Sequence, residues 1–349
     1  MPDTSQVVGL DPAAVTRWFD HLGVRFTEPL RFDRIGLGQS NLTYLVRDAD
    51  DRRWVLRRPP LGQLLASAHD VAREARIMAA LAPTDVPAPQ ILGVAQDPEI
   101  ADVPLVLMEF IDGQVVDTMA IAESLAPQRR RQIGVYLPAT LAKVHAVDID
   151  AVGLSDLASH KPYAHRQLKR WAGQWERSKT RELPELDDLT GRLVAAVPEQ
   201  RELSLVHGDF HLRNVIVSRG DGAVTGVLDW ELSTLGDPLA DMGTLLAYWP
   251  EPGEDIGDFP ASTLNGFPGR AELAHLPGAD RAGSAGAEVL ARAGVVEARH
   301  HRRGRHAPHD GHAGEQGGRR DADGRVDRRV GRHGAKGRRH RRNLVRAKP

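Results

Sequence analysis

The sequence predicts an α+β protein with two lobes: a small lobe built on an antiparallel β-sheet and a larger, mostly helical lobe. An alternating strand at residues 42–46, an acidic turn and a second strand at 53–57 are typical of a β-hairpin. Residues 104–111 form a nearly continuous apolar run that ends in Asp112 and Gly113, as expected of a buried strand that leads into a hinge. Apolar residues recur at helical spacing beyond this hinge, so the helical lobe should follow the sheet.

The small lobe, expected at residues 30–113, begins with a glycine-rich turn ahead of the hairpin and includes a further strand at 91–95. Glycine lets the backbone approach an anion closely, and neighbouring polar side chains can donate hydrogen bonds to it. The turn is therefore a candidate cover for phosphate groups, although an ordinary hairpin turn has the same composition. Its candidate binding residues are Gly36, Gly38, Gln39 and Ser40.

A helix is expected over residues 71–81, because apolar residues recur there at three- and four-residue spacing and form one face. Asp70 stands at its start, where a carboxylate favours the exposed peptide N–H groups. Glu74 borders the apolar face. On the residues alone, Glu74 is a surface carboxylate paired with Arg73 or Arg76 of the same helix.

The residues that can carry chemistry are concentrated in the loop at 207–214, with Asp229 fifteen residues after Asn214. Such an arrangement suits phosphoryl transfer from a metal-bound nucleotide. One carboxylate, Asp209, can orient a hydroxyl and accept its proton, while an amide oxygen and a second carboxylate hold magnesium. The alternative is that Asp209 and Asn214 cap a turn and that Asp229 ends a strand. The expected strands around these residues are 203–206, 215–217 and 223–228.

The pattern H-G-D-x-x-x-x-N followed by L-D-W-E resembles the aminoglycoside phosphotransferase family, also called choline/aminoglycoside kinase-like. Its relatives, the protein kinases, carry H-R-D-x-x-x-x-N and D-F-G at the same places. The resemblance implies a protein-kinase-like fold in which Asp209 is the catalytic base and Asn214 and Asp229 bind Mg²⁺. It also implies that Asp241 hydrogen-bonds the backbone of the catalytic loop, and we expect His207 to do similar structural work.

The resemblance extends upstream to Arg57, which occupies the place of the kinase lysine and would grip the phosphates of ATP as a bidentate fork. It makes Glu74 the partner that holds Arg57 in place. Arginine at this position is similar to the branch of the family joined to acyl-CoA dehydrogenases. The adenine ring would hydrogen-bond to the hinge backbone at Glu109, Phe110 and Ile111.

The larger lobe is expected at residues 114–275, with a helix near 133–145 in which Pro138 predicts a kink or a helix start. Residues 163–177 indicate a second helix whose tryptophans pack in the core or line the substrate cleft, and we favour core packing. Residues 234–242 indicate a loop into a helix, which Asp237 would cap.

The chain changes in composition at about residue 276, and no aromatic residue follows Phe267. Residues 276–349 contain 17 Arg and 2 Lys against 8 acidic residues, a net charge of +11. This tail cannot bury enough apolar surface to fold, so we expect it to be disordered. A basic tail could bind nucleic acid or an anionic membrane. Alternatively it is out-of-frame translation of a GC-rich gene, which we favour because the family-like sequence stops abruptly.

The formal charge of the whole chain is −1, so residues 1–275 carry about −12, which argues against general nucleic-acid binding. The chain has no cysteine, which excludes disulfides and thiol chemistry. It shows no signal peptide and no apolar run long enough to cross a membrane, so a cytoplasmic enzyme is expected. Residues 1–29 are expected to form an N-terminal helix or segment ahead of the small lobe.

These observations predict a small-molecule kinase that moves the γ-phosphoryl group of ATP to a hydroxyl of its substrate. Acceptor candidates are an aminoglycoside, choline, a sugar or amino alcohol, and a hydroxyacyl-CoA. The resemblance to the dehydrogenase-linked branch favours a hydroxyacyl or other anionic acceptor. One alternative is an inactive, truncated homologue that at most binds nucleotide. Another is a nucleic-acid-associated protein that acts through its basic tail.

Overall fold

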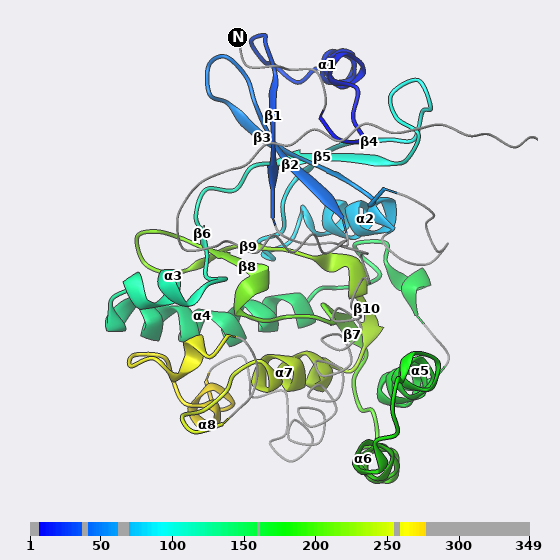
Figure 1. Ribbon diagram of the computed structural model, residues 1–349, viewed down its shortest axis with the longest axis vertical. Helices are drawn as coiled ribbons and strands as arrows, with labels where there is room; N and C mark the ends of the chain where they lie inside the picture. Colours follow the sequence, from blue (N-terminus) through cyan, green and yellow to red (C-terminus); the bar gives the residue numbers. More distant parts are fainter. Residues whose placement is uncertain (1–6, 37–40, 62–69, 159–160, 255–258, 277–349) are drawn as a thin grey trace, which may run out of the picture. The chain divides into compact units, whose positions relative to one another are not determined.

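The computed structural model describes residues 7–36, 41–61, 70–158, 161–254 and 259–276 (Figure 1). Its combination of antiparallel sheet and helices confirms the predicted α+β fold. Apart from its first residue, the tail expected to be disordered lies outside the described residues. None of the helices in the described part of the chain combines the length and the apolar character needed to span a bilayer.

Within the described residues, five strands of the small lobe form one antiparallel sheet in the order β1-β2-β3-β5-β4. Alternate residues of β2 and β3 are buried, so their side chains divide between the two faces of the sheet. β2 pairs with β3 so that Thr43 lies opposite Arg57. The strands are β1 (Arg31–Ile35), β2 (Leu42–Arg47), β3 (Arg53–Arg58), β4 (Ile91–Ala95) and β5 (Leu105–Glu109).

Two helices pack on this sheet, α1 (Pro12–His21) and α2 (Val71–Leu81). Leu105 and Leu107 of β5 belong to the apolar cluster around α1, whereas the intervening Val106 belongs to the cluster around α2. Because β5 is buried on both faces, its sequence is continuously apolar. The segment before residue 30 therefore supplies part of the core of the small lobe.

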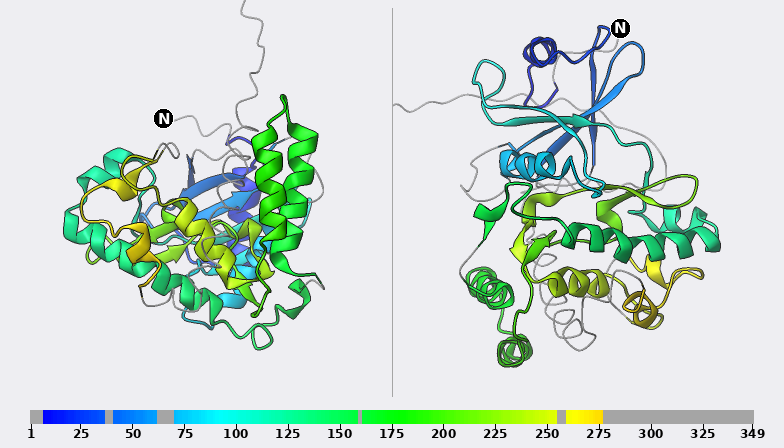
Figure 2. Two further views of the ribbon diagram at one scale, coloured as in Figure 1. Left: turned by 90° about the horizontal axis from the view of Figure 1, so that it is seen from below. Right: turned by 180° about the vertical axis from the view of Figure 1, so that it is seen from behind.

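A long helix, α4 (Pro127–His145), forms the centre of the large lobe and packs against short strands and α7 (Pro238–Ala247) (Figure 1). α5 (Tyr163–Ser178) and α6 (Pro184–Ala195) lie side by side (Figure 2), and both tryptophans of α5 are buried as predicted. The remaining elements are β6 (Gln114–Val115), α3 (Met119–Ser124), η1 (Ser155–Leu157), β7 (Ser204–Val206), η2 (Leu212–Asn214), β8 (Val215–Val217), β9 (Val224–Val227), η3 (Trp230–Leu232), β10 (Thr234–Gly236), η4 (Ala261–Thr263) and α8 (Arg270–Leu273).

In the large lobe, a helix start at Pro138 and a loop directly before α7 were predicted, and both are wrong. The helix near 133–145 begins at Pro127, and Pro138 lies inside it. Ile133 and Leu141, on either side of Pro138, are both buried, so tertiary packing outweighs the cost of a proline in the helix interior. The residues before α7, expected to be a loop, form β10, which pairs antiparallel with β7. Asp237 caps α7 as predicted by accepting the N–H of Leu239 at 3.0 Å.

Candidate active site

Asp241 attaches the loop at 207–214 to α7. Its carboxylate accepts the backbone N–H of His207 and that of Gly208, each at 2.7 Å, and its side chain is fully buried. The Nε2 atom of His145, at the end of α4, lies 3.1 Å from the same carboxylate. Gly208 has a φ of 85°, and a Cβ at this position would lie 2.7 Å from the backbone carbonyl oxygen of Leu232 in η3, so the position requires glycine.

His207 is buried beneath the loop and joins it to the end of β9. Burial lowers the pKa of His207, although nearby carboxylates, Asp241 foremost, oppose the shift. The Nδ1 atom accepts the backbone N–H of Asp209 at 3.3 Å, and Nε2 lies 2.9 Å from the carbonyl oxygen of Leu228. These two contacts assign the ring proton to Nε2. The imidazole therefore supports the loop as a neutral group.

Asp209 and Asn214 lie together in the loop. The side-chain nitrogen of Asn214 donates to the backbone oxygen of Asp209 at 2.9 Å and to its carboxylate Oδ2 at 3.0 Å. Because these bonds use the amide nitrogen, the amide oxygen of Asn214 is the atom that can face a cation. Asp209 keeps a side-chain exposure of 28%, so a substrate can reach its carboxylate.

Asp229 follows β9 and lies next to this loop. A backbone hydrogen bond of 2.8 Å, from the N–H of Leu228 to the carbonyl oxygen of Asn214, joins the two segments. Asp229 has a left-handed backbone with a φ of 68°, which is uncommon for a residue other than glycine. Such strained residues concentrate at functional sites. The structure thus brings Asp209, Asn214 and Asp229 into one region.

Arg57 connects the small lobe to this region. Its Nε atom lies 3.3 Å from Oε2 of Glu74, and its Nη2 atom donates to Oδ1 of Asp229 at 2.8 Å. The second oxygen of Glu74 accepts the backbone N–H of Trp230 at 3.2 Å. One guanidinium and one carboxylate therefore link β3 and α2 to the turn after β9.

The environment of Glu74 decides between its two predicted roles. Its side chain is 2% exposed, so it is not a surface carboxylate. Neither helix neighbour pairs with it: Arg76 binds Asp156, and Arg73 donates to backbone carbonyls within η3 and directly after it. Burial raises the pKa of Glu74 to about 7, although the charge of Arg57 opposes this rise.

The predicted adenine-binding residues lie at the end of β5 and directly after it. Glu109 ends β5, and Phe110 carries the guanidinium of Arg53 at 4.4 Å from its ring centre. Ile111 packs against the hairpin of β8 and β9, where a Cβ added at Gly226 would lie 2.9 Å from its Cδ1 atom. Of the predicted phosphate-binding turn, Gly36 is described and has a φ of 78°, while Gly38, Gln39 and Ser40 lie outside the described residues.

The sequence did not single out two side chains of the loop as candidate site residues. The Nε2 atom of His211 lies 3.4 Å from Oδ1 of Asp209. The guanidinium of Arg213 lies 6.0 Å from the ring centre of Tyr248 and 5.8 Å from that of Phe259. Their place inside the motif was the available signal, but residue spacing in a loop does not give the direction of a side chain.

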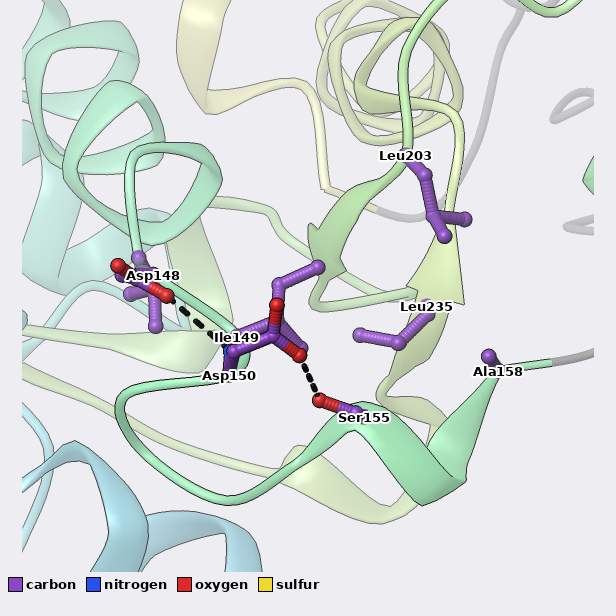
Figure 3. A pocket seen from close by; sticks show the side chains of 8 residues that line it. Asp148, Ile149, Asp150, Ser155, Ala158, Leu203 and Leu235 are labelled. Carbon is purple, nitrogen blue, oxygen red and sulfur yellow. Dashed lines mark hydrogen bonds between the residues drawn. The ribbon is translucent and has the colours of Figure 1, made fainter.

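A cavity of about 370 Å³ opens elsewhere in the large lobe (Figure 3). None of the predicted site residues lines it. Its two acidic residues make local hydrogen bonds. Asp148 accepts backbone N–H groups of the following turn, and Asp150 accepts the hydroxyl of Ser155. The lining residues are Val147, Asp148, Ile149, Asp150, Ser155, Ala158, Leu203 and Leu235.

Comparison with known proteins agrees with the predicted resemblance. Mouse acyl-CoA dehydrogenase family member 10 is 40% identical over 229 residues, which are 65% of this chain and 21% of that protein. Human acyl-CoA dehydrogenase family member 11 is 31% identical over 239 residues, 68% of this chain and 30% of that protein. The chain therefore spans less than a third of the length of these relatives.

Solved structures share the fold. A predicted aminoglycoside phosphotransferase from Ralstonia eutropha JMP134 is 30% identical, with a TM-score of 0.66 over 79% of this chain and 82% of that one. The macrolide 2'-phosphotransferase of Brachybacterium faecium is 22% identical, with a TM-score of 0.53 over 81% of this chain and 90% of that one. Residues 31–276 match the phosphotransferase enzyme family (APH). The resemblance predicted from the sequence is thus confirmed, and the chain belongs to this phosphotransferase family.

Proposed function

We propose that this chain transfers the γ-phosphoryl group of ATP to a hydroxyl group of a small molecule. The observation that carries the proposal is the convergence of charged and amide side chains from β3, α2, the 207–214 loop and the turn after β9. These side chains include a candidate base, two candidate metal ligands and a cation that can bind phosphate. These residues are Asp209, Asn214, Asp229, Arg57 and Glu74.

In the proposed reaction, the acceptor oxygen attacks the γ-phosphorus while the bond from that phosphorus to the β–γ bridging oxygen breaks. ADP leaves, and the hydroxyl proton passes to the carboxylate of Asp209. Most of the catalytic effect comes from positioning and charge stabilisation. Asn214 restrains Asp209 through the 3.0 Å bond to Oδ2, so the base is oriented before the acceptor binds.

The donor set fits Mg²⁺. This ion prefers oxygen ligands and is usually held by one or two protein groups together with substrate phosphates. Asn214 and Asp229 carry such ligands, an amide oxygen and a carboxylate, on two segments that the backbone bond from Leu228 to Asn214 joins. When bound, the ion would neutralise negative charge on the phosphates.

Arg57 supports the proposal as a phosphate-binding group. A guanidinium is planar, and two of its N–H groups can donate in parallel to two oxygens of one phosphate. Glu74 orients the fork through its Nε atom, at 3.3 Å. The backbone at Glu109, Phe110 and Ile111 would bind the adenine ring, in keeping with its place directly after β5.

The proposal is tested by ADP release with Mg-ATP and a panel of hydroxylated acceptors. The panel holds aminoglycosides, choline, sugars, amino alcohols and hydroxyacyl-CoA thioesters. GTP is tested beside ATP, because an aminoglycoside 2'-phosphotransferase-IIIa of similar fold (15% identity, TM-score 0.58) was solved as a GDP complex.

With a working acceptor, Asp209→Asn should lower turnover by about 10³-fold and leave ATP affinity intact. The matched control is Asp156→Asn, which changes an exposed carboxylate. Near-normal turnover of Asp209→Asn contradicts the assignment of the base.

A further inference from the structure

His211 is fixed in one orientation beside the proposed base. Its side chain is only 7% exposed, and its Nδ1 atom accepts the backbone N–H of Arg213 at 3.2 Å. In a neutral imidazole one ring nitrogen accepts and the other carries the proton. The contact with Arg213 therefore assigns the proton to Nε2, the atom that lies 3.4 Å from Oδ1 of Asp209.

Packing against Tyr248 restrains the ring of His211. It lies against the ring of Tyr248, with 4.4 Å between the ring centres. Tyr248 directly follows the last residue of α7, the helix that also carries Asp241. The imidazole is thus held by the loop backbone on one side and by α7 on the other.

The carboxylate of Asp209 is then restrained at both oxygens. Asn214 donates to Oδ2 at 3.0 Å, and the Nε2 atom of His211 lies 3.4 Å from Oδ1. The terminal torsion of an aspartate is broad, so a second contact at the other oxygen further narrows the rotation that the bond from Asn214 leaves to the carboxylate. At 3.4 Å the second contact is longer than a standard hydrogen bond, so it orients the negative charge without sharing the proton.

We propose that His211 is a positioning residue that fixes the carboxylate of Asp209 for phosphoryl transfer, which rests on the function proposed above. Its Nε2–H sets the rotation of the carboxylate, while its Nδ1 atom separately caps the turn at η2. The two ring nitrogens therefore have different jobs. Loss of the contact between Nε2 and Asp209 should lower turnover, whereas loss of the Nδ1 cap should lower stability.

Two substitutions separate the positioning of Asp209 from the capping of η2. In His211→Asn the side-chain oxygen can replace Nδ1 as the cap, but the shorter side chain does not reach Asp209. In His211→Gln the longer side chain can present an N–H at the place of Nε2, but it loses the cap. We expect His211→Asn to lower kcat about 10- to 100-fold with unchanged KM for ATP and unchanged Tm. We expect His211→Gln to recover most of kcat, with a Tm a few degrees lower.

A purely structural role predicts the opposite pattern, with His211→Asn fully active and His211→Gln impaired, and that result overturns the proposal. Asp209→Asn, measured beside them, separates the two hypotheses. If Asp209→Asn is inactive and His211→Asn has normal activity, the proposal for His211 is wrong and the proposed function stands. If the wild-type chain transfers no phosphate, both are wrong.

The tautomer gives a test that does not depend on activity. The protein is labelled with ¹⁵N-histidine, and the signals missing in His211→Asn identify the His211 ring. A neutral ring protonated at Nε2 supports the proposal. A ring protonated at Nδ1 overturns it, because Nε2 would then have no proton to direct at Asp209.

Discussion

Asp241→Asn tests whether a single buried carboxylate holds the 207–214 loop in place. The wild-type carboxylate accepts two backbone N–H groups, each at 2.7 Å, from His207 and Gly208. An asparagine offers one oxygen, so one N–H keeps an acceptor while the side-chain NH₂ group faces the other N–H. The substitution therefore leaves a buried donor without a partner and removes the charge from the remaining bond.

The expected cost follows from these two losses. A buried donor without a partner costs about 1–3 kcal/mol, and the loss of charge assistance adds roughly 1 kcal/mol. We therefore expect the free energy of unfolding to fall by about 2–4 kcal/mol, which lowers Tm by roughly 5–15 °C in a unit of this size. Displacement of the loop should also lower turnover about 10²-fold, because Asp209 and Asn214 move with it.

The assay is thermal unfolding and steady-state turnover of Asp241→Asn beside Asp237→Asn. The control makes the same chemical change at the start of the same helix, where Asp237 caps a single N–H at 3.0 Å. Asparagine caps helices as well as aspartate, so the control should change little. Equal Tm values and equal turnover for both variants would refute the reasoning about Asp241.

Three further predictions concern the backbone and the Arg57 pair. Gly208→Ala should cost about 2–4 kcal/mol in urea unfolding because of strain and contact with a carbonyl oxygen at 2.7 Å. Gly23→Ala, at a φ of 69° with open space around it, should cost only about 1 kcal/mol, and equal costs would contradict this. Arg57→Lys should weaken ATP binding about 10-fold, measured by calorimetry, because one ammonium cannot replace a fork that holds two carboxylates. Its control, Arg76→Lys in an exposed pair, should bind ATP normally, and equal affinities for the two variants count against this role for Arg57. ATP affinity should also weaken as the pH falls below about 7, where Glu74 takes up a proton and loses its hold on Arg57. The stability trend has the opposite sign, because a folded-state pKa of about 7 lies above the ordinary 4.5, so the contribution of Glu74 is present below pH 4.5 and lost as the pH rises through 7. Glu74→Gln should flatten both profiles, and a variant that keeps the wild-type pH dependence would show that another group titrates.

The small lobe was predicted closely because its elements have strong local patterns. The strands expected at 42–46 and 53–57 each extend one residue further, to Arg47 and Arg58. Helix α2 covers the expected residues and begins after Asp70, whose carboxylate accepts the N–H of Arg73 at 2.9 Å. Hairpins and capped amphipathic helices are local structures, so nearby residues determine them.

Predictions failed where distant contacts decide the structure. Pro138 is tolerated in α4 because the helix is buried on both sides of it, which no local pattern shows. β10 forms because it pairs with β7, about thirty residues earlier in the chain. The candidate site residues were predicted from their motif, but the contact of Arg57 with Asp229 and that of His211 with Asp209 depend on side-chain directions, which the motif does not give.

The most direct test of the proposed nucleotide site is the Tm of the full chain with ATP alone, Mg²⁺ alone and both together. A ligand at about 100 times its Kd stabilises the folded state by about 2.7 kcal/mol, which corresponds to a rise of several degrees. We predict this rise only when ATP and Mg²⁺ are both present, its loss in Asp229→Asn, and its retention in Asp156→Asn. The absence of a cooperative transition, or equal Tm values under all conditions, would contradict a nucleotide site built from Asn214, Asp229 and Arg57.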